Sequence, residues 1–445
     1  MQTQERSPAR PTRGSGTQAW YAVFVLLCAS ILSYLDRGII NVLVTDLRRS
    51  LHLSEVQISL IQGLSFSVFF VVACIPVGSL VDRFSRRNII IVGVFGWSVM
   101  TAACGLADNF WQLFLARAGV GIGEACLIPA AYSMISDLFP SSKRGRPMSV
   151  LLIGMAVGAA ASSMIGGAVL KLMGDQLTLS VPLLGETEVW RLAFFTVAMP
   201  GALCVLLLAS IREPERVTTR RPHDQEGGFT RFLGGHWRTF LPLYLGIACI
   251  SVLSYATANW APTALVRVLG YSRGDAGVMI GAIMVPASII GAGLGGLIGD
   301  RLIAGGKAYG RLRAWLGGTL PIVLGCLMLI LGGSPWVFLA GYFIIVATSS
   351  AFGAMSYPAL YDSLPGQFHG RAAGVGTLSG NLFGMAGGTT MVAVLTEHVF
   401  RNDSMVHYSM AIVAAAAAIL STSLVAIQLR GYERLRKTLA SSAQH

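Results

Sequence analysis

Charged residues are scarce in this chain, and their scarcity excludes an ordinary soluble fold. Asp, Glu, Lys and Arg make up 12% of the 445 residues, whereas soluble domains carry about 25%. Hydrophobic residues reach 54%, and the mean hydropathy is +0.65. We therefore expect an all-α polytopic membrane protein, because helices satisfy their own backbone hydrogen bonds in lipid.

Cysteine and histidine are also few, with seven of each. The cysteines all lie in or at the ends of apolar segments and form no Cys-x-x-Cys pair, which favours packing roles over disulfides or a zinc site. The chain contains no His-Glu-x-x-His motif and no Gly-x-Ser-x-Gly motif. We expect neither an enzyme nor a cofactor-binding protein.

What the sequence has in abundance is long apolar runs, each close to or above the ~20 residues that a bilayer requires. The twelve predicted spans are residues 18–46, 56–81, 87–107, 110–138, 147–173, 190–211, 238–268, 275–302, 310–331, 335–361, 371–396 and 405–429.

The net charge of +12 follows the loops between these spans. With the N-terminus placed inside, 24 of the 33 Lys and Arg residues fall on that side and 7 on the other, and Arg37 and Arg117 lie within spans. This bias predicts that both termini are cytoplasmic. It also accounts for the basic residues without a nucleic-acid partner.

Three landmarks recur in the same order, which predicts two six-helix halves. Asp-Arg ends the second and eighth spans, Phe-Leu-Ala lies in the fourth and tenth, and Gly-Arg opens the fifth and eleventh, at offsets of 218, 224 and 225 residues. The expected regions are a disordered cytoplasmic tail (1–17), an N-terminal bundle (18–212), a polar linker (213–237), a C-terminal bundle (238–430) and a cytoplasmic tail (431–445). Between the fifth and sixth spans, residues 176–189 alternate as a hairpin would, although an irregular loop fits equally well.

Two charged pairs interrupt the N-terminal half. Arg117 and Glu124 stand about two helical turns apart on one face of the fourth span, and Asp36 and Arg37 are adjacent in the first. A charge at this depth costs at least ~2.5 kcal/mol and usually faces a cavity or a partner. We therefore interpret these four residues as the working centre of a transporter.

The C-terminal half offers aromatic and neutral polar side chains at corresponding depths. We predict that they line the substrate site, although an aromatic residue in a span can equally serve packing. These candidates are Tyr255, Asn259, Trp260, Tyr357, Tyr361 and Asn381. One charged wall and one aromatic wall would suit an amphiphilic substrate.

Residues 78–87, Gly-Ser-Leu-Val-Asp-Arg-Phe-Ser-Arg-Arg, resemble the signature loop of the major facilitator superfamily, and residues 295–301 resemble its second copy. The resemblance covers nearly the whole chain. It implies that the signature residues form an inner gate that braces helix 2 against helix 11 and breaks as the protein opens inward. The implied gate residues are Gly78, Asp82, Arg83, Arg86, Arg87, Asp300 and Arg301. Helix 5 lacks the proline of the family's antiporter motif, so antiport has no support.

A narrower resemblance is to the Spinster family. It rests on Tyr34-Leu-Asp36-Arg37-Gly38, on Arg117-x-x-x-Gly121-x-Gly123-Glu124-Ala125, and on Ile135-Ser-Asp137-Leu-Phe139 before a basic loop. The resemblance implies a carrier of lysophospholipid or sphingosine phosphate in a bacterial inner membrane. Sugar-acid and organic-anion symporters share part of the pattern, and helix 11 departs from the animal proteins at Ser379-Gly-Asn381.

From these patterns we predict roles for the charged centre. Asp36 and Glu124 are expected to respond to protons, and Arg37 and Arg117, with Tyr34, to bind the anionic headgroup, because Arg suits phosphate recognition. Purely structural ion pairs, Asp36 with Arg117 or Arg37 with Glu124, are the alternative. The expected partners are the substrate and membrane lipid, and a proton gradient is the expected driving force for a functional monomer.

Overall fold

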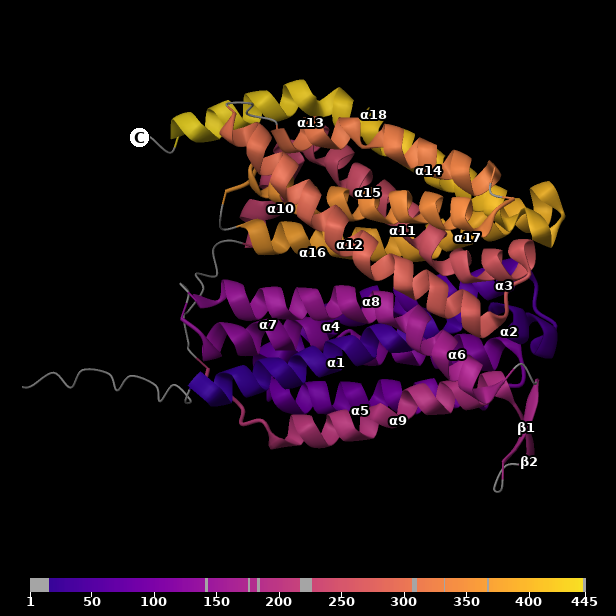
Figure 1. Cartoon of the computed structure of the whole chain (residues 1–445). Coiled ribbons are helices and arrows are strands. Elements are labelled where there is room, and N and C mark those ends of the chain that lie inside the picture. Colours follow the sequence, from indigo (N-terminus) through magenta and orange to yellow (C-terminus); the bar gives the residue numbers. More distant parts are fainter. Residues whose placement is uncertain are drawn as a thin grey trace, which may run out of the picture.

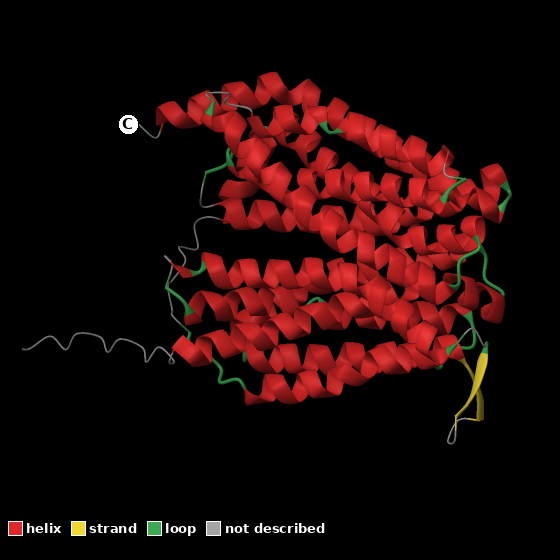
Figure 2. Cartoon of the chain, viewed as in Figure 1, coloured by secondary structure: helices red, strands yellow, loops and turns green. Residues whose placement is uncertain are grey.

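The computed structural model consists almost wholly of helices that run side by side, with one two-stranded hairpin at one end (Figures 1 and 2). It describes residues 16–140, 143–174, 177–181, 185–216, 226–305, 310–331, 333–365 and 368–442. Most of the predicted N-terminal tail and the middle of the linker lie outside these ranges.

The N-terminal half contains the six spans predicted for it. Its elements are α1 (Gly16–Val42), α2 (Val44–Leu51), α3 (Glu55–Ser59), the π-helix η1 (Leu60–Leu64), α4 (Ser65–Arg83), α5 (Arg86–Cys104), α6 (Phe110–Glu124), α7 (Leu127–Leu138), α8 (Gly145–Met173), β1 (Thr178–Val181), β2 (Gly185–Glu188) and α9 (Val189–Ser210). The first span ends at Val42 rather than residue 46, because the chain breaks there and restarts as α2.

The C-terminal half repeats this arrangement. Its elements are α10 (Glu226–Gly235), α11 (Trp237–Leu269), α12 (Arg273–Ala304), α13 (Gly310–Gly317), α14 (Thr319–Leu331), α15 (Pro335–Tyr361), α16 (His369–Ser379), the π-helices η5 (Gly380–Gly388) and η6 (Leu395–Phe400) on either side of α17 (Thr389–Val394), the 3-10 turn η7 (Asp403–Met405) and α18 (Val406–Ser442). Helix α10 lies within the predicted linker, and α18 continues through most of the predicted C-terminal tail.

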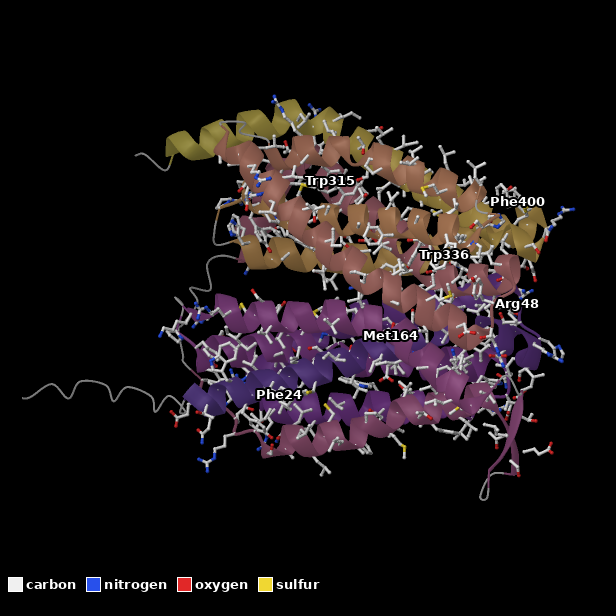
Figure 3. All side chains as sticks on the ribbon, viewed as in Figure 1. Phe24, Arg48, Met164, Trp315, Trp336 and Phe400 are labelled. Atoms are coloured by element: carbon white, nitrogen blue, oxygen red, sulfur yellow. The ribbon has the colours of Figure 1, made fainter. Side chains whose placement is uncertain are left out.

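Eleven helical segments of the described residues are long and apolar enough to cross a membrane, and the 29-residue α8 supplies the remaining crossing of the twelve predicted. Large apolar side chains such as Phe24 and Trp336 face outward, as expected for contact with lipid (Figure 3). The predicted twelve-helix architecture is therefore confirmed.

The two halves are joined at the end of the bundle that carries α2 and the hairpin, which we call the hairpin end. The opposite end, where α1 begins and α18 ends, we call the tail end, and there the ribbons of the halves diverge (Figure 1). A Cβ at Gly277 of α12 would lie 2.7 Å from the carbonyl oxygen of Ser163 in α8. This close approach explains why small residues line the contact between the halves.

Strands β1 and β2 pair with each other, which favours the hairpin over the irregular loop that the sequence left open. Its strands pair antiparallel, with Thr178 opposite Glu188 and Val181 opposite Gly185. The hairpin lies at the start of α9 and covers that side of the hairpin end.

Candidate functional site

Arg37 and Glu124 form an ion pair between α1 and α6 at the centre of the N-terminal half. Arg37 Nε donates to Glu124 Oε2 at 2.6 Å, and the Ser33 hydroxyl donates to the same oxygen at 2.6 Å. The guanidinium carbon of Arg37 lies 4.7, 4.5 and 5.2 Å from the ring centres of Tyr34, Phe66 and Phe70. The Arg37 side chain keeps 11% of its surface exposed, whereas Glu124 keeps none. This aromatic cage orients a cation that can still be reached.

Asp36 points toward side chains of α5 and α6, and Glu124 of the ion pair stays within electrostatic range of it. The residue is fully buried, and neither carboxylate oxygen has a hydrogen-bond partner among the described residues. Trp97 and Thr101 of α5 are its polar neighbours. Arg117, also fully buried, donates from Nη1 to the backbone oxygen of Asp36 at 3.0 Å. The adjacent residues Asp36 and Arg37 therefore serve different sides of the helix.

Of the two ion pairs that the sequence left open, the structure contains the one between Arg37 and Glu124. Arg117 lies within electrostatic range of Asp36, but its described contact is with the backbone. The roles predicted for these four residues in proton and headgroup binding stay predictions.

Tyrosines gather where the two halves face each other across this centre. Tyr255 of α11 donates to Asn381 Oδ1 at 3.2 Å and is close enough to interact electrostatically with Tyr34 and Arg37. Tyr132 of α7, which the sequence analysis missed, interacts in the same way with Tyr34 and Tyr357. The sequence could have indicated Tyr132, because it is a polar aromatic residue in the same predicted span as Arg117 and Glu124.

Two further predicted residues lie toward the tail end of α15. Tyr357 shares a 3.3 Å hydrogen bond with Thr377, and Tyr361 stacks on His369 with ring centres 4.7 Å apart. Both side chains are partly exposed. They extend the aromatic wall of the C-terminal half toward the tail end.

Asn259 and Trp260 lie elsewhere, in a buried hydrogen-bond chain between the halves. Gln62 donates to Asn41 at 3.0 Å, Asn41 donates to Asn259 at 3.0 Å, and Asn259 donates to Thr389 at 2.9 Å. The Trp260 indole N–H donates to the backbone oxygen of Thr389 at 3.0 Å. These side chains tie α1, η1, α11 and α17 together on the hairpin-end side of the charged centre.

An ionic network closes the hairpin end. Glu55, with 1% of its side chain exposed, pairs with Arg48 of its own half at 2.7 Å and with Arg267 of the other half. Arg48 also pairs with Asp403 at 2.6 Å, and Arg273 with Asp46. Burial raises the pKa of Asp46, although Arg273 and Arg49 act in the opposite direction. Arg267 and Arg273 lie on the side that the sequence analysis placed outside the cytoplasm, and each forms an ion pair with a residue of the N-terminal half.

At the tail end, the predicted gate residues of the first half contact that half and the start of the predicted linker. Arg86 is buried and pairs with Asp137 and with Glu213, the latter at 2.9 Å. Asp82 and Arg83 are exposed. The guanidinium of Arg216 donates hydrogen bonds to backbone oxygens of this loop.

The second half contains the counterpart of the pair between Arg86 and Asp137. Arg311 lies 225 residues after Arg86, and it pairs with Asp362, which lies 225 residues after Asp137, at 2.7 Å. Arg311 also pairs with Asp300 at 2.9 Å, whereas Arg301 is exposed. The sequence repeat is therefore also a repeat of ion pairs.

Glu213, the first residue of the predicted linker, holds the start of α5. Its carboxylate accepts from the backbone N–H groups of Arg86 at 3.1 Å and Arg87 at 2.8 Å, and from the Ser85 hydroxyl at 3.0 Å. Burial acts to raise the pKa of Glu213, but these hydrogen bonds prevail and lower it.

Among the described residues, no group of three or more His, Cys, Asp and Glu side chains could hold a metal ion.

Comparison with known proteins assigns the chain to a family. The sequence pattern of the Major Facilitator Superfamily matches residues 26–389. An MFS-type efflux pump of Mycolicibacterium smegmatis is 30% identical over 69% of this chain and 68% of its own. Protein spinster homolog 1 of Rattus norvegicus is 29% identical over 72% of this chain, and the probable L-galactonate transporter of Escherichia coli is 28% identical over 64%. The chain spans 59% of the rat protein and 63% of the E. coli protein.

The solved structures agree with this assignment. A bacterial homologue of the human lysosomal transporter Spinster, in an inward-facing and unoccupied conformation, superposes with a TM-score of 0.79 over 96% of this chain and 99% of its own, at 24% identity. A D-xylose–proton symporter superposes with a TM-score of 0.67 at 17% identity. Together with the repeat of helices and ion pairs, these matches show that the chain belongs to the Major Facilitator Superfamily, and they make it similar to Spinster proteins.

Proposed function

We propose that this transporter moves an amphiphilic anionic lipid, of the lysophospholipid or sphingosine phosphate type, by proton-coupled alternating access. The observation that carries the proposal is the partly exposed guanidinium of Arg37, opposite the tyrosines of the C-terminal half. Arg binds phosphate through a fork of N–H donors. An aromatic wall suits the apolar part of the same molecule.

The pair between Arg37 and Glu124 provides a means of coupling. A protonated Glu124 no longer attracts Arg37 as an anion, so the guanidinium becomes available to a headgroup. Proton and anion then bind together, and the loss of one favours the loss of the other. Ser33 keeps Glu124 oriented in both states through its hydroxyl.

The closed hairpin end and the diverging tail end support an inward-facing arrangement of the halves, since the positive-inside bias places the tail end in the cytoplasm. Opening to the other side requires the ionic network around Glu55 to separate. The exposed Asp82 and Arg83 would then meet the opposite half as an inner gate.

The second candidate is proton-coupled transport of a small organic anion, a sugar acid above all. It is favoured by the match to the probable L-galactonate transporter and by the hydrogen-bonding amide of Asn381, which accepts from Tyr255 near the centre. The exposed Arg37 would bind a carboxylate in place of a phosphate.

Reconstitution into proteoliposomes separates the two candidates. We expect labelled lysophospholipid to become protected from albumin extraction, faster with a pH gradient than without one, and labelled L-galactonate to be left outside. Arg37→Gln should abolish the protection, with Lys171→Gln as a variant of an exposed residue outside the site. Uptake of galactonate alone would support the second candidate, and movement of neither would contradict both.

A further inference from the structure

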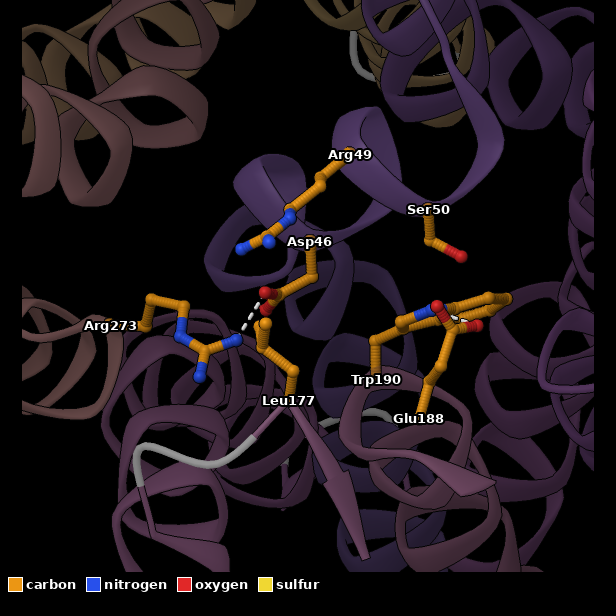
Figure 4. A pocket seen from close by; sticks show the side chains of 7 residues that line it. All are labelled: Asp46, Arg49, Ser50, Leu177, Glu188, Trp190 and Arg273. Atoms are coloured by element: carbon orange, nitrogen blue, oxygen red, sulfur yellow. Dashed lines mark hydrogen bonds and ion pairs between the residues drawn. The ribbon is translucent and has the colours of Figure 1, made fainter. Parts of the chain in front are cut away.

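A second cavity lies at the hairpin end, apart from the central site. Its volume is about 280 Å³, and it is bounded by α2, the hairpin, the start of α9 and the start of α12 (Figure 4). The lining residues are Asp46, Arg49, Ser50, Leu177, Glu188, Trp190 and Arg273. The transport mechanism proposed above uses none of them as a ligand.

The cavity contains a buried carboxylate oxygen that lacks a partner. Asp46 is 6% exposed, and its Oδ1 accepts from Arg273, whereas its Oδ2 has no hydrogen-bond partner among the described residues. Figure 4 shows this carboxylate between Arg273 and Arg49. A buried acceptor left unpaired costs free energy, which a donor from a ligand would recover.

The side chains that line the cavity include two arginines and two carboxylates. Glu188 lies at the other side of the cavity, where its Oε2 accepts from the Trp190 indole N–H at 3.0 Å and from Arg191 Nε at 3.1 Å, while its Oε1 is left for a ligand (Figure 4). A ligand that is only anionic would meet Asp46 and Glu188, and one that is only cationic would meet Arg49 and Arg273. A ligand with both charges is complementary to all four.

We propose that this cavity binds a small zwitterion, with its ammonium group at Asp46 and Glu188 and its phosphate or carboxylate at Arg49. The Ser50 hydroxyl completes the polar lining of the site, and the Trp190 ring, over which Arg191 lies at 4.4 Å, closes one side of it. Phosphoethanolamine, either free or as the headgroup of a lipid, has this chemistry.

The position of the cavity couples such a ligand to the conformation. Six of its lining residues belong to the N-terminal half, and Arg273 belongs to the C-terminal half. The cavity is therefore complete only while the hairpin end is closed. A ligand that binds one state alone shifts the equilibrium toward it, so the zwitterion holds the hairpin end closed and slows turnover from that side.

The test uses isothermal titration calorimetry of the full chain in a maltoside detergent. Phosphoethanolamine should bind, and inorganic phosphate or ethanolamine alone should bind at least ten times more weakly. Arg49→Gln and Glu188→Gln should each weaken binding about tenfold, which corresponds to 1.4 kcal/mol. Neither change removes the pair between Asp46 and Arg273. Lys171→Gln breaks an exposed pair with Asp275 outside the cavity and should leave binding unchanged.

Hydrogen exchange in nanodiscs identifies the source of the ligand. If a lipid headgroup occupies the cavity, exchange of residues 44–51 and 273–277 is slower in phosphatidylethanolamine than in phosphatidylglycerol. If the ligand is soluble, added phosphoethanolamine slows exchange in both lipids, and either result supports the site. The proposal is overturned if no zwitterion changes heat or exchange, or if Arg49→Gln and Glu188→Gln respond as the unmodified chain does. Its failure would leave the proposed lipid transport untouched, because Arg37 and Glu124 lie outside the cavity.

Discussion

Arg37 and Glu124 form an ion pair of 2.6 Å in which the arginine is partly exposed and the glutamate fully buried. The pair joins the first and fourth spans and directs its accessible side toward the tyrosines of the opposite half. Because a proton on Glu124 would remove the attraction, the proposed coupling depends on this one buried group.

Replacing Glu124 with Gln should uncouple transport from the proton gradient. The amide keeps the size of the side chain but can neither bind nor release a proton in this range. We expect downhill substrate exchange in proteoliposomes to continue and its stimulation by a pH gradient to disappear. Ser33→Ala is the matched control, because it removes the other hydrogen bond to the same oxygen and keeps the carboxylate. Equal stimulation in Glu124→Gln and the unmodified chain would contradict the coupling role.

Asp36 and Arg117 should be energetically coupled although they form no close ion pair. Both are fully buried and within electrostatic range of each other, so neutralising either one removes an opposite charge from the surroundings of the other. We expect Asp36→Asn and Arg117→Gln each to lower the midpoint of thermal unfolding, and the double variant to recover part of the loss. The coupling should amount to about 0.5–3 kcal/mol. As a control, the destabilisations caused by Asp36→Asn and Lys171→Gln should add in their double variant. If the destabilisations caused by Asp36→Asn and Arg117→Gln also add, the coupling is refuted.

Glu55→Gln should loosen the hairpin end. Glu55 joins Arg48 and Arg267 from the two halves, and its replacement weakens charge-assisted hydrogen bonds across the boundary. We expect amide exchange in residues 42–56 and 389–400 to become roughly tenfold faster, as for a loss of about 1.4 kcal/mol. Lys171→Gln also removes an ion pair between the halves, but an exposed one, and should have little effect. Equal acceleration in both variants would show that burial of Glu55 is unimportant.

Glu213 should stabilise the protein in a pH-dependent way. Because hydrogen bonds lower the pKa of Glu213, its contribution is present above the pKa of an unfolded-state glutamate, about 4.3, and is lost as the pH falls through the lower folded-state value. Glu213→Gln should therefore lower the thermal midpoint at pH 7 more than near pH 4. The comparison needs only thermal unfolding in detergent at the two pH values. If Glu213→Gln lowers the thermal midpoint by the same amount at both pH values, the charge of Glu213 has no role in stability.

The helices and their repeat could be predicted because the signals are local. Apolar length predicts each span, and the offset of 225 residues that links Gly145 with Gly370 also links Arg86 with Arg311. The candidate site was predicted less completely. Asn259 and Trp260 are polar groups at the right depth, yet their partners are Asn41 and Thr389, which come from distant parts of the chain.

The sequence by itself determined that this protein crosses the membrane in two related halves and carries charges inside the first, because composition and periodicity are properties of short segments. It could not decide which of Asp36 and Arg37 meets Glu124, since neighbouring residues differ by only about 100° around a helix. Tertiary contacts made that choice, because they bury Asp36 beside Arg117 of α6 and Trp97 of α5 and leave Arg37 within reach of the opposite half. Likewise, only the contact between the halves brought Arg273 to Asp46 and so created the second cavity.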